Sequence, residues 1–183
     1  MLREIEKKIN VDLDPFDHAI IKNILPQDEI EKAEADFKQF NNTLDSGNPR
    51  YQKTKRHLED FEIMPKSIKE IIKNFYSQTF ISILEKKFQL NNIKPDWTLR
   101  GGGMHSSQKG GFLKLHSDFI YTRKSKMRRV LNLLIYLNSN WEESWKGSLE
   151  LWDKKMTKCK KKISLEKLIK GHSGLSEIYE PRY

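Results

Sequence analysis

Residues 110–119 read Gly-Gly-Phe-Leu-Lys-Leu-His-Ser-Asp-Phe and place His116 and Asp118 two positions apart in an apolar, strand-like run. Alternate side chains of a strand point to the same face, so we expect the imidazole and the carboxylate to project together. Two such ligands are most of a two-histidine, one-carboxylate face, which holds non-haem Fe(II) with positions open for oxygen and a co-substrate. The stretch therefore predicts a metal site that lacks its third ligand.

The composition predicts one folded domain. A chain of 183 residues with 37% hydrophobic residues is long enough to bury a core. The charged N-terminal stretch has no apolar signal region, and no segment approaches the length of a membrane span. The single cysteine, Cys159, excludes an internal disulfide framework and fits a reducing compartment. We therefore expect a cytoplasmic protein that makes no membrane contact.

The net charge of +9 is concentrated in one segment. Between Asp153 and Lys170, eight lysines stand against two acidic residues, so the rest of the chain is close to balanced. No aromatic residues alternate with basic ones in the pattern that stacks bases. We therefore expect a solvated lysine-rich tail and no nucleic-acid partner.

The N-terminal half has mainly helical patterns. Residues 16–25 predict a short strand and residues 28–40 an amphipathic helix, followed by a polar loop over 41–55. Residues 65–90 carry apolar side chains at helical spacing, which indicates a long helical region packed on a sheet.

From Trp97 the pattern alternates, which predicts strands over 112–119, 129–138 and 148–152. The odd-numbered face of the second strand is aliphatic and should pack on the helices: Leu131, Leu133, Ile135 and Leu137. Its even-numbered face mixes polar and apolar residues, as does a barrel interior that carries a ligand. Helices followed by clustered strands predict an α+β domain whose sheet holds the site.

Taken in order, the motifs G-G-F-L-K-L-H-S-D-F, R-R-V-L-N-L-L-I-Y-L-N and W-K-G-S-L-E-L-W-D resemble the 2-oxoglutarate- and Fe(II)-dependent oxygenases of the prolyl-4-hydroxylase type. The resemblance covers about residues 96–163 and implies one oxygenase-like domain over 1–183. Its fold would be a double-stranded β-helix, a jelly-roll or cupin-like barrel. Residues 1–95 would be the helical support, 96–163 the barrel strands and 164–183 a divergent tail.

The resemblance also implies a chemistry. Iron would be bound by His116 and Asp118, 2-oxoglutarate and O2 would be co-substrates, and ascorbate a further cofactor. Tyr136 would hydrogen-bond the 2-oxoglutarate carboxylate, although an ordinary core tyrosine fits its position as well. The reaction would hydroxylate a peptidyl residue, such as proline, or a small metabolite.

The likeness ends after the L-E-L-W-D motif. The family continues with an apolar strand, a histidine and a basic residue that pairs with the keto acid, whereas residues 164–170 here predict a short capped helix. His172, with Arg182 ten residues later, is a candidate third ligand with its basic partner, or else a surface histidine. His105 is a weaker candidate in a glycine-rich turn, and His18 and His57 are expected to be structural.

Two functions therefore stay open. One is an active dioxygenase, and the other is a catalytically impaired relic or binding module whose barrel is truncated or divergent at the C-terminus. An intact enzyme needs a third ligand and a cation for the keto acid, so the C-terminal segment distinguishes them. The sequence leaves the substrate and the oligomeric state open.

Overall fold

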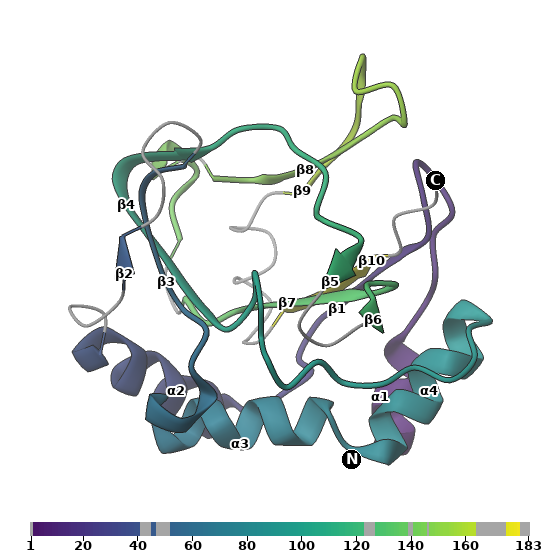
Figure 1. The fold of residues 1–183 in the computed structure, drawn as a ribbon, viewed down its shortest axis with the longest axis horizontal. Coiled ribbons are helices and arrows are strands. Elements are labelled where there is room, and N and C mark those ends of the chain that lie inside the picture. The colour runs from purple at the N-terminus through teal and green to yellow at the C-terminus, as the bar shows by residue number, and fades with distance from the viewer. Residues whose placement is uncertain are drawn as a thin grey trace.

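The computed structural model describes residues 2–40, 45–46, 52–122, 127–138, 141–145, 147–163 and 175–179. Its helices lie together on one side and its strands on the other, so the fold is a mixture of helices and sheets, as the sequence predicts (Figure 1). None of the helices in these ranges is long and apolar enough to cross a membrane.

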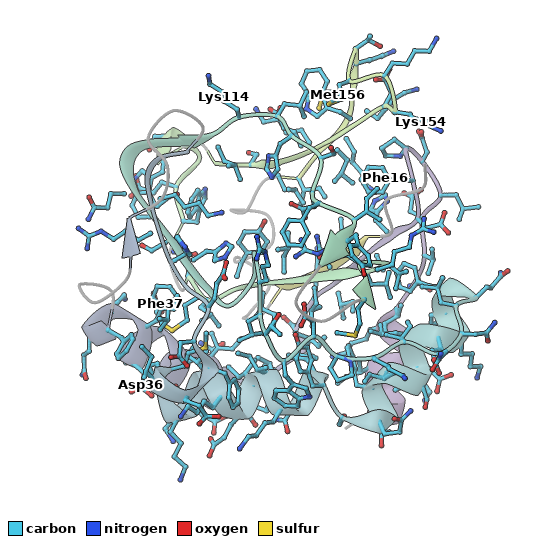
Figure 2. All side chains as sticks on the ribbon, in the orientation of Figure 1. Phe16, Asp36, Phe37, Lys114, Lys154 and Met156 are labelled. Atoms are coloured by element: carbon cyan, nitrogen blue, oxygen red, sulfur yellow. The ribbon has the colours of Figure 1, made fainter. Side chains whose placement is uncertain are left out.

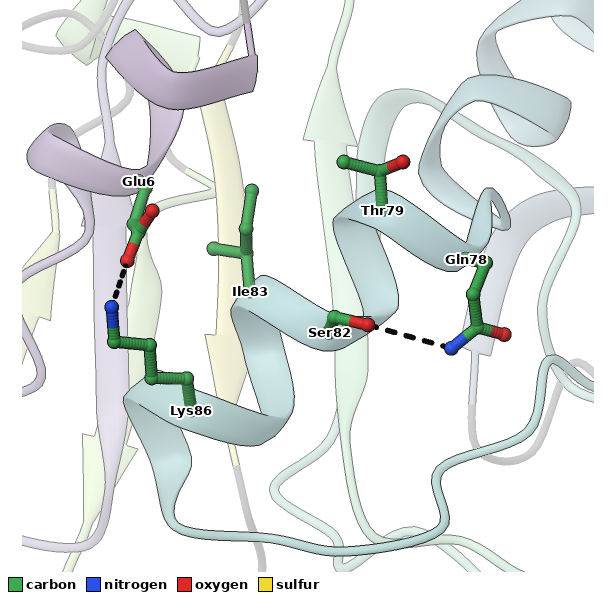
Figure 3. A pocket seen from close by; sticks show the side chains of 6 residues that line it. All are labelled: Glu6, Gln78, Thr79, Ser82, Ile83 and Lys86. Carbon is green, nitrogen blue, oxygen red and sulfur yellow. Dashed lines mark hydrogen bonds and ion pairs between the residues drawn. The ribbon is translucent and has the colours of Figure 1, made fainter.

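The helical side consists of α1 (Leu2–Lys8), α2 (Gln27–Phe40), α3 (Lys66–Phe75) and α4 (Gln78–Phe88). The predicted helical region after Pro65 is divided in two, because Ser77 caps α4 by accepting a hydrogen bond from the Phe80 N–H at 3.3 Å. An ion pair of 2.7 Å between Glu6 and Lys86 joins α1 to α4 beside an open surface depression (Figure 3). This depression contains none of the candidate site residues.

The described strands form four small sheets, so a closed double-stranded β-helix is not seen. The first has the order β1 (His18–Ile21), β10 (Leu175–Tyr179) and β7 (Asn132–Tyr136), and the second has β2 (Asp45–Ser46), β3 (Gln52–Leu58) and β4 (Met104–Leu113). Two pairs complete them: β5 (Tyr121–Thr122) with β6 (Met127–Arg128), and β8 (Leu149–Trp152) with β9 (Cys159–Ile163). All pairings are antiparallel.

The sheet β1–β10–β7 separates two apolar clusters. On one face, Ala19 and Ile21 pack with the helices, together with the four odd-numbered residues 131–137 around β7. On the other face, Ile20 and Tyr136 pack against Leu151 and Ile163 of the β8–β9 hairpin. The predicted division of β7 into a helix-facing and an inner face is therefore confirmed.

Two expectations about the strands are wrong. The predicted loop 41–55 overlaps β3, whose polar sequence Q-K-T-K-R-H-L gives no apolar alternation although it pairs with β4. The sequence also suggested no strand after Ile163, yet β10 is the middle strand of its sheet. The sequence L-S-E-I-Y is too short to reveal this strand, and its partners lie far away in the chain. The helix predicted over 164–170 lies outside the described residues.

The lysine-rich segment is a hairpin as far as Ile163. Asp153 closes its turn by accepting hydrogen bonds from the Thr157 N–H and hydroxyl, both at 2.7 Å. Lys154 and Met156 belong to this turn, and both side chains are exposed (Figure 2). Lys161 instead donates to Asp12 at 2.8 Å. This lysine of the segment therefore links β9 to the N-terminal part of the chain.

Candidate metal centre

His116 and Asp118 lie beyond the end of β4. The predicted strand 112–119 is therefore wrong in its bounds, since β4 ends at Leu113 and both residues belong to the following irregular segment. The structure nevertheless brings them together, with His116 Nε2 3.6 Å from Asp118 Oδ1. The His116 side chain is 49% exposed and that of Asp118 is 23% exposed, so the pair is open to solvent on the imidazole side.

This separation fits two ligands of one ion. Metal bonds to histidine nitrogen and carboxylate oxygen are about 2.0–2.2 Å long, so two atoms on one ion lie at most about 4.4 Å apart. The observed 3.6 Å lies within that limit. The separation is therefore compatible with two ligands of one ion.

The orientation of His116 also suits a ligand. Its Nδ1 is 2.7 Å from the backbone oxygen of Lys114, which only accepts, so Nδ1 donates the proton. A ligating histidine usually has this arrangement, because a hydrogen bond on one nitrogen fixes the tautomer that leaves the other free for the metal. The Asp118 carboxylate beside it raises the pKa of His116, and the Lys114 carbonyl adds to that shift.

Asp118 is held through its other oxygen. Oδ2 accepts a hydrogen bond from the Asn132 side chain and lies 3.3 Å from Nη1 of Arg129. Arg129 is itself fixed, because it donates to the backbone oxygen of Arg100 at 2.7 Å and its guanidinium lies 4.0 Å from the Phe119 ring centroid. The carboxylate is thus oriented with Oδ1 toward His116.

The sequence did not identify these two partners. Asn132 lies on the even-numbered face of β7, and its side-chain amide donates to Asp118. The sequence could have indicated Asn132, because it belongs to the even-numbered face of the strand, which was expected to line the interior. Arg129 lies on a loop, and nothing in the local sequence separates it from Arg128.

A third ligand is not found among the described residues, which contain no cluster of three histidine, cysteine, aspartate or glutamate side chains suited to a metal. His105 is engaged elsewhere: its Nε2 is 2.8 Å from the Gly102 oxygen, and its ring lies against that of His57. Desolvation, with the Lys55 ammonium in addition, lowers the pKa of His105 to about 4. His172 lies outside the described part of the chain.

The remaining histidines have structural surroundings. His18 is buried, with Nδ1 2.9 Å from the Phe16 oxygen and Nε2 2.9 Å from the Lys161 ammonium. The first contact makes Nδ1 the donor, so Nε2 accepts from Lys161 and links β1 to β9. Across the β3–β4 pair, His57 is opposite His105.

Tyr136 lies on the same face of β7 as Asn132, four residues away, or about 13 Å along the strand. Its side chain packs in the inner apolar cluster with Phe16, Ile20, Trp141 and Leu149. Tyr136 thus packs as an ordinary core tyrosine would, which was one of its two expected roles. Its contact with a keto acid stays a prediction. Arg182 lies outside the described residues.

Residues 102–173 match the family model of the 2OG-Fe(II) oxygenase superfamily. The matched segment is less than half of the chain, and it contains His116, Asp118, Asn132 and Tyr136 and ends one residue after His172. No curated protein and no solved structure matches the chain. The match supports this superfamily and, with it, oxygenase chemistry that uses Fe(II), 2-oxoglutarate and O2.

Proposed function

We propose that this chain is a 2-oxoglutarate-dependent dioxygenase whose Fe(II) is bound by His116 and Asp118. The observation that carries the proposal is the 3.6 Å approach of His116 Nε2 to Asp118 Oδ1. This pair lies within the segment that matches the oxygenase superfamily. When bound, iron couples the decarboxylation of 2-oxoglutarate to succinate with the hydroxylation of a C–H bond by O2.

The residues around the pair would prepare it for the metal. Asn132 and Arg129 hold one oxygen of Asp118, so the other oxygen stays available as a single-atom ligand. The Lys114 carbonyl holds the tautomer of His116 in which Nε2 carries the free lone pair. These contacts would keep both ligands in position before an ion arrives.

The third ligand in this proposal is His172, since it is the remaining histidine of the matched segment. Tyr136 and Arg182 are proposed to contact the keto acid, and the complete fold is proposed to be a double-stranded β-helix of the prolyl-4-hydroxylase type. Ascorbate has no support from the matched family or from the described residues. A relic without activity is disfavoured, because the partners that orient Asp118 are present.

For the substrate we favour a peptidyl residue, with proline as one candidate, over a small metabolite. Large apolar side chains next to the ligands are exposed, namely Leu113, Leu115, Phe119 and Tyr121. An exposed apolar rim suits a macromolecular substrate, which can cover it on binding. A small polar metabolite would leave these side chains in water. The cytoplasm remains the proposed compartment.

The test is iron binding and 2-oxoglutarate conversion by the purified protein. The wild-type chain should bind Fe(II) under anaerobic conditions and, once O2 is added, produce succinate. His116→Ala should abolish both while the circular dichroism spectrum stays unchanged. His105→Ala is the matched control and should retain both. An unchanged iron affinity in His116→Ala would refute the assignment of this ligand.

A further inference from the structure

A single peptide bond joins the end of β3 to Arg129. The N–H of Gly101 donates to Oε1 of Glu59, the residue after β3, at 2.7 Å. The oxygen of the same peptide bond, that of Arg100, accepts from Arg129 Nη2 at 2.7 Å. The N–H and C=O of a trans peptide lie in one plane and point in opposite directions. Glu59 and Arg129 therefore hold this peptide bond, the Arg100–Gly101 peptide, from its two sides.

Arg129 also packs directly on the glycine turn. Gly101 has a φ of +69°, in the left-handed region that glycine adopts readily, and a Cβ built there would lie 2.8 Å from Phe119 Cε1 and 3.3 Å from Arg129 Nη2. On its other side the guanidinium lies 4.0 Å from the centroid of the Phe119 ring. The Arg129 side chain is 14% exposed, so these contacts leave it little room to move.

The bond to the Arg100 oxygen decides where the rest of the guanidinium points. A guanidinium is rigid and planar, so the position of one nitrogen fixes that of the other. With Nη2 bound to this oxygen, Nη1 lies 3.3 Å from Asp118 Oδ2. A rotation of the peptide would withdraw the oxygen from Nη2 and would leave Arg129 free to turn away from Asp118.

Glu59 is the group that opposes this rotation. A peptide next to a glycine rotates easily, because the glycine has no Cβ to restrict it. The Glu59 carboxylate is a charged acceptor for the N–H, and charge-assisted hydrogen bonds are shorter and stronger than neutral ones. It also polarises the peptide, which makes the oxygen on the far side a better acceptor for Arg129.

We propose that Glu59 is a positioning residue of the candidate metal centre, an inference that rests on the proposed function. Glu59 fixes the Arg100–Gly101 peptide, which in turn fixes Arg129. Arg129 then holds one oxygen of Asp118, so that the other stays available to the metal. Glu59 and Gly101 both precede residues 102–173, the segment that matches the oxygenase superfamily.

The first measurement needs no metal. The Phe119 ring current shifts the NMR signals of the Arg129 side-chain protons, because the guanidinium lies over the ring. In metal-free protein, Glu59→Ala should move these signals toward those of an unrestrained arginine. Glu59→Gln keeps an oxygen that accepts from the Gly101 N–H and should preserve the shifts. Unchanged signals in Glu59→Ala would overturn the inference, whatever the variant does to the metal.

The second measurement is calorimetric titration with Mn(II). Removal of a group that contacts a metal ligand usually costs 10- to 100-fold in affinity, and Glu59 acts one contact further away. Glu59→Ala should therefore weaken Mn(II) binding about 3- to 10-fold, and Glu59→Gln should restore most of the loss. Glu62→Ala is the matched control, because it removes an exposed carboxylate three residues away and should bind Mn(II) as the wild type does.

A double-mutant cycle separates positioning from general stability. If Glu59 acts through Arg129, Glu59→Ala should cause no further loss of Mn(II) affinity in a chain that already carries Arg129→Met. An equal loss in both backgrounds would show that Glu59 acts by another route and would refute the inference. If Glu59→Ala binds Mn(II) as tightly as the wild type, the inference is wrong while the proposed function stands. If the wild type binds no Mn(II), the two fail together.

Discussion

The two carboxylate oxygens of Asp118 have different contacts, and these contacts set the orientation of the carboxylate in the candidate site. Oδ1 faces His116, whereas Oδ2 is held by Asn132 and Arg129. A carboxylate fixed in this way gives up little conformational freedom when it binds an ion. The partners of Asp118 should therefore contribute to metal affinity although they do not touch the metal.

Asn132→Ala tests this contribution. Loss of the amide leaves Asp118 less well oriented, and we expect affinity for Mn(II) or Fe(II) to fall about 10- to 100-fold, as is usual when a partner of a metal ligand is removed. The measurement is metal titration by calorimetry. Asn138→Ala is the control, because Asn138 is exposed just beyond the same strand. Equal affinities in the two variants would show that Asn132 does not orient the ligand.

Metal binding should depend on the protonation of His116. The Asp118 carboxylate raises the pKa of His116 above its ordinary value of 6.5, and only the neutral imidazole binds a metal. Metal affinity should therefore increase as the pH rises through this raised pKa and become constant above it. A titration of the His116 ring protons by NMR in the metal-free protein gives the pKa directly. Asp118→Asn should lower it, and a higher pKa in that variant would show that the carboxylate does not cause the shift.

At the level of elements, Gly103 sets the start of the β3–β4 pair. Its φ of +78° is in the left-handed region, and a Cβ built there would lie 2.1 Å from the Leu58 oxygen and 2.9 Å from the Met64 side chain. No side chain fits against a backbone oxygen at that distance. The close approach of this turn to the end of β3 thus requires a glycine.

Gly103→Ala should lower the free energy of unfolding by about 2 kcal/mol or more, because the backbone must shift or remain strained. Gly102→Ala is the matched control. The nearest atom to its Cβ would be the Leu99 oxygen at 3.3 Å, so a much smaller loss is expected. Urea denaturation of both variants measures the difference. Comparable stabilities would show that the turn adapts without cost.

The elements that the sequence predicts well are those with apolar periodicity. Helix α2 begins and ends within a residue of the predicted range 28–40, and the two faces of β7 pack as expected. Strand β3 is polar, so its pairing with β4 depends on a partner about fifty residues away and leaves no local pattern. The sequence did not predict strand β10 for the same reason, because this strand forms by pairing with β1 and β7, which are distant in the chain.

The site was predictable in part. The spacing of His116 and Asp118 identified the pair, although the structure brings them together in an irregular segment and not in a strand. Arg129 and Asn132 contact Asp118 from segments that a linear motif does not include. Such contacts depend on tertiary structure, and a single sequence does not encode them in its spacing.

On the scale of the whole molecule, the candidate site joins segments that belong to different strands or follow them. His116 and Asp118 follow β4, Arg129 follows β6, and Asn132 begins β7. The strand β7 in turn packs on the helices through its other face. A ligand held by these residues should bind the folded chain only, since the unfolded chain separates them.

Ligands should therefore stabilise the entire fold. A ligand that binds only the native state at about 100 times its Kd adds about 2.7 kcal/mol, which raises the melting temperature of a chain of this size by roughly 5–10 °C. We expect Mn(II) alone to raise it, Mn(II) with 2-oxoglutarate to raise it further, and 2-oxoglutarate alone to have little effect, because the keto acid needs the metal. EDTA should reverse the shift, and Asp118→Ala should not show it. A full shift with 2-oxoglutarate in the absence of metal, or an undiminished shift in Asp118→Ala, would mean that the stabilising ligand binds somewhere other than His116 and Asp118.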